Sequence, residues 1–295
     1  MPAYLKISGS TYLVKGSPSS IVYVDDEAVY IVDPGHGGGK VKSLNKTIKD
    51  LRGDRRVIAV VTHYHSDHLE AIARKPALYD EVIASAQDAS GVEDPTLRIT
   101  ATFGYPLPPD TPFLPFRAPP VRVSRVIRPG DSIGPLKTIH LPGHTPGQIG
   151  VLTPDGVLYA ADAVFGSKVL ERYQLPYHLN PCKALETLES LKEVEWEALV
   201  PGHGPIMKRE EAITTIEANI QAIRRLLDSV VETLKTRGRL RAAEVTRLLV
   251  DPERAGGPGM YMLLEQTVRG VLACLTKDGR VRPSLDGEGL TWEAP

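Results

Sequence analysis

The stretch VIAVVTHYHSDH, residues 57–68, decides how the rest of the chain is interpreted. Its first five residues are apolar and mostly β-branched, which is typical of a buried strand. Residues 69–74 suit the start of a helix, with Ser66 or Asp67 as the expected N-cap. The polar residues between the two elements therefore lie on a turn at the carboxyl end of a strand, where open α/β folds place ligand sites.

Three histidines and an aspartate in this turn, His63, His65, Asp67 and His68, predict a metal site. Imidazole nitrogens and a carboxylate suit a borderline divalent metal such as zinc. His63 and His65 are two residues apart, so both can point the same way from an extended segment. Asp67 and His68 lie past the bend and could reach a second metal. A solvated polar loop would account for a single histidine, but it does not account well for three histidines and an aspartate this close together.

The composition is that of a soluble globular protein. The chain has 295 residues, 42% of them hydrophobic and 24% charged, with a net charge of −1 that argues for neither nucleic acid nor an anionic membrane as partner. No signal peptide or membrane-spanning run is expected. Two cysteines, Cys182 and Cys274, are too few for a disulfide framework and fit a reducing cytoplasm. Scarce Asn and Gln beside 25 prolines indicate a thermophilic source.

The first part of the chain predicts an antiparallel meander. Short strands with intervening turns are expected at residues 4–7, 12–15, 21–24 and 28–32. The glycine-rich turn DPGHGGG, residues 33–39, fails the Walker pattern and is interpreted as a tight turn with close backbone approach. A helix over residues 40–51 and a strand over residues 81–85 flank the histidine-rich stretch.

The amino-acid composition changes over residues 92–120. Eight prolines interleave with the aromatic residues Phe103, Tyr105, Phe113 and Phe116. A structureless segment of this length is expected to be either a lid over a binding site or a packed surface excursion. Its apolar rings favour contact with substrate or with another subunit.

A second set of strands follows at residues 121–127, 136–141, 150–153 and 157–161, then a helix at 184–191 and a strand at 198–200. His144 lies in the turn PGHTPG, Asp162 ends a strand, and His203 lies in the turn PGHGP. A single histidine is usually structural. Three polar residues at strand ends, downstream of a clustered metal motif, favour a shared site.

The C-terminal part predicts three helices, at residues 210–235, 240–250 and 262–275, and then strands at 280–282 and 289–292. This order is typical of a winged-helix module, so residues 1–206 and 207–295 are expected to form two domains. Six arginines could contact nucleic acid: Arg237, Arg239, Arg241, Arg247, Arg280 and Arg282. Because acidic residues nearly balance them, packing or oligomerisation is favoured, and a homodimer is left open.

Together these motifs resemble the metallo-β-lactamase superfamily over roughly residues 3–206. The resemblance implies an α/β (α+β) fold, an αββα sandwich with two metals at one edge and a small helical C-terminal domain. It assigns the first metal to His63, His65 and His144, the second to Asp67, His68 and His203, the bridge to Asp162, and a supporting position to Asp33. The C-terminal module is similar to an appendage in a subgroup that includes endoribonucleases.

The resemblance predicts a hydrolase using a bridging hydroxide on a small-molecule thioester, lactone or other ester. Zinc is the favoured metal, with manganese or iron as alternatives. Asp162 stands where the commonest β-lactamases have cysteine, which argues against antibiotic hydrolysis. A metal-dependent ribonuclease, a mononuclear iron dioxygenase and a ligand-sensing protein remain alternatives.

Further side chains are expected to take part in the reaction or to lie near the site. Asp67 is expected to orient the hydroxide and carry its proton. Tyr173, Tyr177 or His178 either donates a hydrogen bond to the oxyanion or packs under the proline-rich segment. His36 is expected near the site, whereas His140 is expected to be structural.

Overall fold

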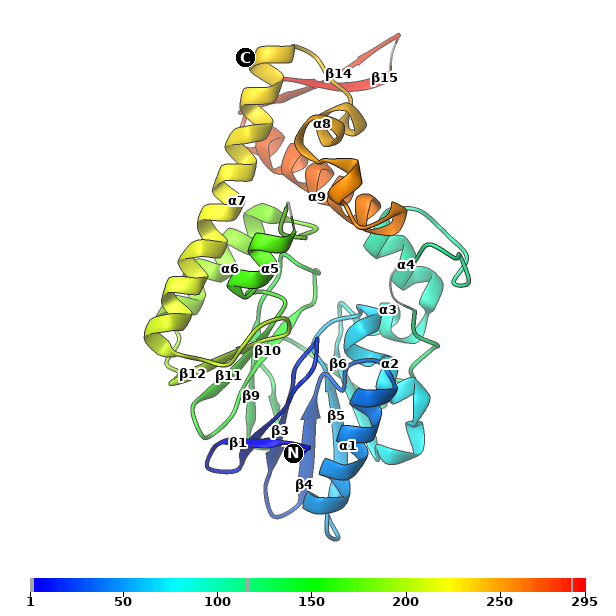
Figure 1. Cartoon of the computed structure of the whole chain (residues 1–295), viewed down its shortest axis with the longest axis vertical. Coiled ribbons are helices and arrows are strands. Elements are labelled where there is room, and N and C mark those ends of the chain that lie inside the picture. Colours follow the sequence, from blue (N-terminus) through cyan, green and yellow to red (C-terminus); the bar gives the residue numbers. More distant parts are fainter. Residues whose placement is uncertain (1–2, 115–116, 174, 288) are drawn as a thin grey trace.

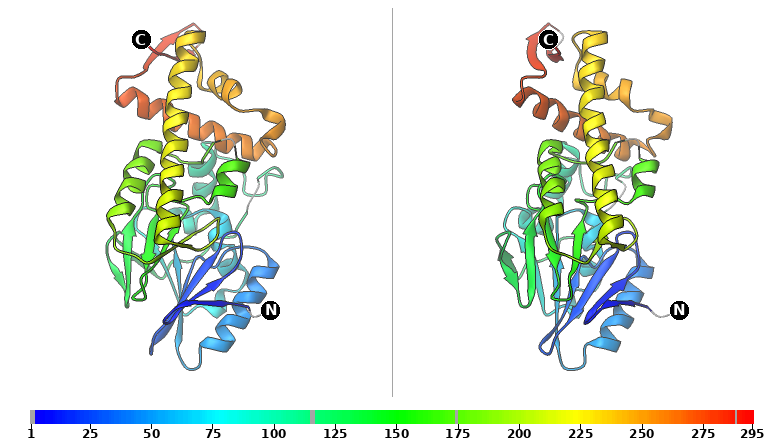
Figure 2. Two further views of the ribbon diagram at one scale, coloured as in Figure 1. Left: turned by 60° about the vertical axis from the view of Figure 1, so that its left-hand side comes forward. Right: turned by 90° about the vertical axis from the view of Figure 1, so that its left-hand side faces the viewer.

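The computed structural model describes residues 3–114, 117–173, 175–287 and 289–295. Two β-sheets pack face to face, helices cover their outer faces, and a helical C-terminal segment stands at one end of the sandwich (Figures 1 and 2). This arrangement confirms the predicted αββα fold. Within the described residues no helix is both long enough and apolar enough to span a membrane.

The first sheet has seven strands in sequence order. They are β1 (Leu5–Ser8), β2 (Thr11–Val14), β3 (Ser20–Val24), β4 (Ala28–Val32), β5 (Arg56–Val61), β6 (Glu81–Ser85) and β7 (Arg125–Ile127). Strands β1 to β4 form the predicted antiparallel meander, and β4 to β7 are parallel. Helices α1 (Gly38–Leu51) and α2 (Ser66–Arg74) cover its outer face, where Leu44 and Leu69 are buried.

The second sheet has the order β13-β12-β11-β10-β9-β8, and only β11 and β12 are parallel. Its strands are β8 (Ser132–Ile133), β9 (Leu136–His140), β10 (Ile149–Leu152), β11 (Val157–Ala161), β12 (Ala198–Pro201) and β13 (Met207–Lys208). Ile58 and Ile83 of the first sheet pack in one buried cluster with Leu136 and Tyr159 of the second. Because both inner faces are apolar, their burial holds the sandwich together.

The proline-rich segment is only partly irregular, which corrects the expectation for residues 92–120. It contains the end of α3 (Ala89–Glu93) and all of α4 (Pro95–Phe103). Asp94 accepts hydrogen bonds from the amides of Thr96 and Leu97, so it caps α4, and Pro95 suits the first helical turn. The residues after α4 that the structure describes, up to residue 124, form neither helix nor strand. Pro115 and Phe116, part of the predicted segment, lie outside the described residues.

One predicted strand needs correction, and three short elements were not predicted. The predicted strand at residues 121–127 is reduced to β7, which joins the first sheet beside β6 rather than the second. Helix α5 (Ser167–Arg172) and the short strands β8 and β13 were not predicted. The remaining elements are α6 (Pro181–Glu193) and the 3₁₀ helices η1 (Pro76–Leu78) and η2 (Pro252–Arg254).

The C-terminal elements follow the predicted order: α7 (Arg209–Arg237), α8 (Ala242–Leu249), α9 (Pro258–Lys277), β14 (Arg282–Asp286) and β15 (Gly289–Glu293). They share a continuous apolar core with the sandwich. Leu199 of β12, Leu188 of α6, Ile220 of α7 and Val268 of α9 belong to one buried cluster. The division into two domains and the winged-helix assignment stay predictions.

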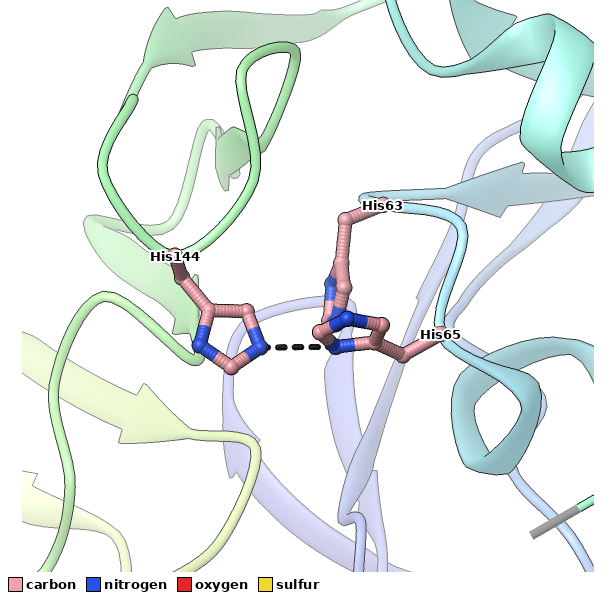
Figure 3. Close-up of side chains that lie close together, drawn as sticks. All are labelled: His63, His65 and His144. Atoms are coloured by element: carbon pink, nitrogen blue, oxygen red, sulfur yellow. Dashed lines mark hydrogen bonds between the residues drawn. The ribbon is translucent and has the colours of Figure 1, made fainter. Parts of the chain in front are cut away.

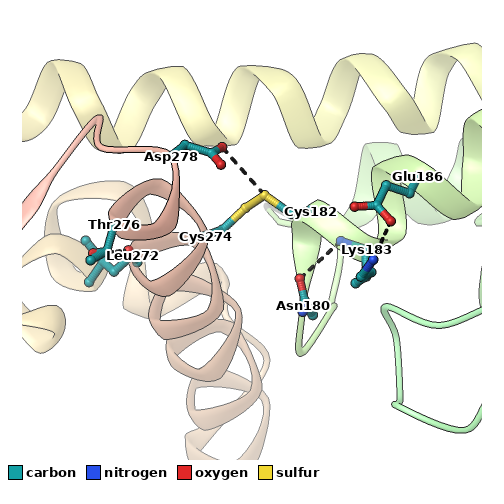
Figure 4. Close-up of a disulfide and its surroundings, with 8 residues drawn as sticks. All are labelled: Asn180, Cys182, Lys183, Glu186, Leu272, Cys274, Thr276 and Asp278. Carbon is teal, nitrogen blue, oxygen red and sulfur yellow. Dashed lines mark hydrogen bonds and ion pairs between the residues drawn. A yellow bond between two sulfur atoms is a disulfide. The ribbon is translucent and has the colours of Figure 1, made fainter.

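A disulfide joins the two parts, whereas the sequence-based expectation was two cysteines without a crosslink. Cys182 at the start of α6 is bonded to Cys274 near the end of α9, and their Cα atoms lie 6.0 Å apart (Figure 4). That separation is normal for a disulfide. The two residues are 92 positions apart in the chain, so only the tertiary fold brings them together.

Candidate metal centre

The predicted ligands meet at one edge of the sandwich because they lie in turns after strand ends or in the first turn of the helix that follows β5. His63 and His65 follow β5, His144 lies between β9 and β10, and Asp162 and His203 follow β11 and β12. Asp67 and His68 lie in the first turn of α2. The N-cap of α2 is His65 and no side chain caps it, so the expected capping by Ser66 or Asp67 is wrong.

His63, His65 and His144 form the first group that could hold a metal ion (Figure 3). All three rings are buried. His65 Nδ1 and His144 Nε2 lie 2.8 Å apart. Burial lowers the pKa of His63 and His65 well below the usual range. These rings are therefore neutral at pH 7, the state in which imidazole binds a metal.

Asp67, His68 and His203 form a second group that could hold a metal ion. Asp67 Oδ2 is 3.3 Å from His203 Nε2. Asp162 lies between the two groups. Its Oδ1 atom is 3.4 Å from His68 Nε2, and its Oδ2 atom is 3.4 Å from His203 Nε2 and 3.5 Å from His144 Nε2. One carboxylate therefore faces histidines of both groups.

Unpartnered polar atoms show that this residue set fits metal binding. Within the described residues, His63 Nε2, His65 Nε2, His68 Nε2 and Asp162 Oδ1 are buried and form no hydrogen bond, although the last two lie 3.4 Å from each other. Buried nitrogen and oxygen atoms are nearly always paired, so four unpaired ones in one cluster need another partner. Two divalent cations meet that need, and the N/O ligands accept zinc, manganese or iron.

Sequence comparison identifies the family. Residues 13–203 match the sequence profile of the metallo-beta-lactamase superfamily. The chain belongs to this superfamily. Its clustered histidines and aspartates are the site expected for a binuclear member, and the predicted family is thereby confirmed.

Two curated relatives are similar to part of the chain. The acyl-coenzyme A thioesterase MBLAC2 of Gallus gallus is 28% identical over 170 residues, 52% of this chain and 58% of that protein. A hydroxyacylglutathione hydrolase of Shewanella sp. (strain ANA-3) is 30% identical over 144 residues, 48% of this chain and 45% of that protein. The chain therefore spans about half the length of these relatives.

Two solved structures share the fold over nearly the whole chain. A metallo-beta-lactamase family protein from Thermus thermophilus aligns with a TM-score of 0.70 at 20% identity, covering 97% of this chain and 99% of that chain. A beta-lactamase domain protein from Burkholderia ambifaria aligns with a TM-score of 0.72 at 16% identity, covering 100% and 97%. The shared fold thus includes the C-terminal helices.

Asp33 supports the metallo-beta-lactamase site from behind, as predicted. Its Oδ2 atom accepts hydrogen bonds from His68 Nδ1 at 2.7 Å and from the Thr62 hydroxyl at 2.6 Å, and its Oδ1 atom accepts from the Thr62 amide at 2.8 Å. Asp33 and His68 are both inaccessible to solvent. This contact holds the His68 ring with Nε2 towards Asp162, an arrangement that commonly orients metal ligands.

Sequence reasoning missed Asp88, which connects two ligand loops. Its carboxylate accepts hydrogen bonds from the Thr145 hydroxyl at 2.6 Å, the Gly147 amide at 2.8 Å and the Tyr64 amide at 3.3 Å. It therefore braces the loop of His144 against the loop of His65. A single aspartate after a strand carries no sequence signal for this role, since all its partners are distant in the chain.

The predicted oxyanion donors do not all reach the site. The Tyr177 hydroxyl donates to the carbonyl of Thr102 at 3.0 Å, although Tyr177 also lines the cavity next to the ligand groups. His178 is buried beside Phe165 and is not among the cavity-lining residues. This placement favours a packing role for His178. Tyr173 is partly exposed and lines the cavity.

The remaining two histidines lie as expected. His36 lines the cavity, and its Nε2 atom is 2.9 Å from the Ser17 carbonyl oxygen. His140 lies within β9, with its Nε2 atom 3.1 Å from the Pro146 carbonyl oxygen. The contact of His140 within its own hairpin agrees with a structural role.

Ser17 positions His203 and provides a first test of the site. Its hydroxyl lies 2.8 Å from His203 Nδ1. We expect Ser17→Ala to weaken the binding of added zinc at the Asp67, His68 and His203 group about tenfold, because the His203 ring loses the partner that orients it. Competition with a chromophoric chelator measures this affinity.

Ser17→Thr keeps the hydroxyl and should restore the affinity, and Ser132→Ala changes an exposed serine on β8 as a matched control. Unchanged zinc affinity in Ser17→Ala would show that the hydroxyl does not position His203.

A cavity of about 440 Å³ opens above the two ligand groups. His65, Asp67, His144, Asp162 and His203 lie along one side of it. Residues of α4, α5 and α9 form much of the rest, and most of them are apolar. Its size is typical of small-molecule sites.

Proposed function

We propose that the chain is a binuclear metal-dependent hydrolase that cleaves a small-molecule thioester, with lactones and other esters as related substrates. The observation that carries this proposal is the position of the ligand groups, which open into a mainly apolar cavity walled by the chain's own helices. Such a cavity suits an acyl compound better than a polymer. The names of the two curated relatives, an acyl-coenzyme A thioesterase and a hydroxyacylglutathione hydrolase, support the choice of a thioester.

In this proposal each residue group has a defined task. His63, His65 and His144 would hold one cation, and Asp67, His68 and His203 would hold the other, with the Asp162 carboxylate between the two groups. Two divalent cations supply a hydroxide nucleophile near neutral pH and a Lewis acid for the substrate carbonyl.

We assign the role of proton carrier to Asp67, and the position of its carboxylate in the cavity lining, beside His203, supports this assignment. Burial raises the pKa of Asp67, but His68 and His203 outweigh this effect and hold it below the usual range. The carboxylate is therefore ionised at neutral pH, and the proposal gives it the task of orienting the hydroxide and passing its proton to the leaving group.

The ribonuclease alternative has less support. Three of the six candidate arginines are paired with carboxylates: Arg239 with Glu293, Arg241 with Glu244, and Arg280 with Asp228. Paired arginines attract phosphates less strongly, so the C-terminal segment is a poor basic track.

The proposal is tested by metal analysis and a substrate panel. Untagged protein is stripped with chelator, refilled with zinc or manganese, and assayed with acyl-coenzyme A, acylglutathione, a lactone and an RNA oligonucleotide. We expect two metal ions per chain and thiol release that disappears on stripping and returns on refilling. A single bound iron with oxygen consumption, or cleavage of RNA alone, would contradict the proposal.

Five finer assignments remain part of this proposal. They are zinc as the native metal, a thermophilic source, a cytoplasmic location, a winged-helix-type C-terminal domain beginning at residue 207, and a homodimer. The disulfide is compatible with a cytoplasmic location if the source is hyperthermophilic, since such organisms keep intracellular disulfides.

A further inference from the structure

Helix α9 of the C-terminal segment forms one wall of the cavity above the metal groups. Met260, Leu263 and Leu264, in its first two turns, line the cavity together with Ile99 and Phe103 of α4. Figure 1 shows α9 running from the hairpin β14–β15 down to α4. Sequence reasoning assigned this helix no part in the site, because its residues lie far from every predicted ligand.

The wall is held in place by specific contacts. Gln266 of α9 donates a hydrogen bond to the carbonyl of Phe103 at 2.8 Å. Gly104 ends α4 with φ of 72°, and a Cβ atom there would lie only 2.3 Å from the Gln266 side chain. A residue other than glycine would therefore strain the backbone at this φ and displace the Gln266 amide from its hydrogen bond to Phe103. Ile99, Phe103 and Leu114 form a buried cluster with Leu263 packed against it. The α4–α9 wall thus exists before any ligand arrives.

The chemistry of the wall defines what it can bind. The cavity face of Ile99, Phe103, Met260, Leu263 and Leu264 offers only hydrocarbon and thioether surface, which favours an apolar group. Residues of the two ligand groups line the same cavity, and their position determines where the reacting carbonyl must lie. A substrate that fills both parts has an apolar chain attached to a hydrolysable acyl carbon.

Cationic side chains line the cavity on the α5 side. Lys168 and Arg172 are both exposed, and neither forms an ion pair within the described residues. They suit a negatively charged leaving group that extends towards solvent. Arg98 and Thr102 of α4 also line the cavity, but the Arg98 guanidinium donates to three backbone carbonyls and the Thr102 hydroxyl donates to the Arg98 carbonyl. The α4–α9 side therefore favours an apolar group, and the α5 side favours an anionic one.

We propose that the α4–α9 wall binds the apolar acyl chain of the substrate, so that the C-terminal segment completes the active site and sets acyl-chain selectivity. This inference rests on the proposed hydrolase function. It assigns the substrate class as a thioester of a medium-length or longer fatty acyl group with an anionic leaving group.

Replacement of Leu263 tests the wall. The assay compares acetyl-, hexanoyl- and decanoyl-coenzyme A with the zinc-loaded full chain. Leu263→Trp places a bulky ring in the cavity, and we expect the decanoyl-to-acetyl ratio of kcat/KM to fall about tenfold. Leu248→Trp adds the same ring at an exposed position on α8 and should leave the ratio unchanged. Leu263→Ala removes apolar contact with the acyl chain without adding bulk, and it should also lower the decanoyl-to-acetyl ratio. It replaces the tryptophan variant as the test if that variant is unstable.

Binding of decanoate, measured by calorimetry, gives a second readout that needs no turnover. We expect both Leu263 variants to bind decanoate several-fold more weakly than the wild type. If thioesters are cleaved but neither the ratio nor decanoate binding changes, the wall does not bind the chain and the hydrolase proposal survives. If no thioester is cleaved while Leu263 still controls decanoate binding, the hydrolase proposal fails and the apolar subsite stands.

Discussion

Asp162→Asn should reduce bound metal from two ions per chain to one or fewer and lower kcat/KM about a thousandfold. Asp162 is the residue whose two carboxylate oxygens face His68 on one side and His144 and His203 on the other. Burial raises its pKa, but His203 and His68 outweigh this and hold the pKa of Asp162 well below the usual range. The native carboxylate is therefore fully charged, and asparagine removes that charge with little change in shape.

Elemental analysis and steady-state kinetics measure the two effects on the same preparations. Asp26→Asn removes an exposed carboxylate from the β3–β4 turn and should change neither. Equal melting temperatures of the metal-free proteins would show that the Asp162 variant is folded. Two tightly bound ions together with wild-type turnover in that variant would refute a shared role for Asp162.

The grouping of the candidate ligands was predictable from sequence because most of them lie in a turn that directly follows a recognisable strand. The apolar run before His63 and the Pro/Gly turns around His144 and His203 are local patterns, so the strand ends could be located without tertiary information. The order of the C-terminal elements follows from the same kind of periodic signal, whereas the sandwich was predicted from the resemblance to the family. Asp33 was found by its resemblance to a family position, and its contacts with His68 agree.

What sequence could not supply depends on contacts between distant residues. Helix α4 was hidden by its proline-rich surroundings, although Asp94-Pro95 is a good helix start in isolation. Its packing also depends on Arg98, which is buried and donates to the carbonyls of Val92 and Ala118. Asp88 and the α9 wall are likewise defined by partners far away in the chain. In each case the missing information is which surfaces meet, and a local pattern cannot encode it.

The disulfide also depends on residues that are distant in the chain. Its removal should lower the free energy of unfolding by about 2–4 kcal/mol. Cys182 and Cys274 close a loop spanning 92 positions, and a long loop favours the upper part of that range because the crosslink restricts the unfolded chain more. The bond ties α9 to α6, and Gly270 on the same helix approaches the Leu179 carbonyl so closely that a Cβ atom there would lie 2.5 Å from its oxygen. The crosslink therefore secures an interface that is already tightly packed.

Denaturant unfolding of the Cys182→Ser/Cys274→Ser double variant measures the loss, and wild-type protein treated with a phosphine reductant should show the same decrease. Thiol titration of the unfolded, unreduced wild type should find no reactive thiol, and two after reduction. Two thiols before reduction would mean that the pair is not crosslinked, and the double variant should then be nearly as stable as the wild type. Helix α9 is held by the disulfide and by apolar packing, and it carries the cavity residues Met260 and Leu263. The double variant removes only the disulfide. If the apolar packing alone keeps α9 in place, the variant should still bind decanoate although its unfolding midpoint falls.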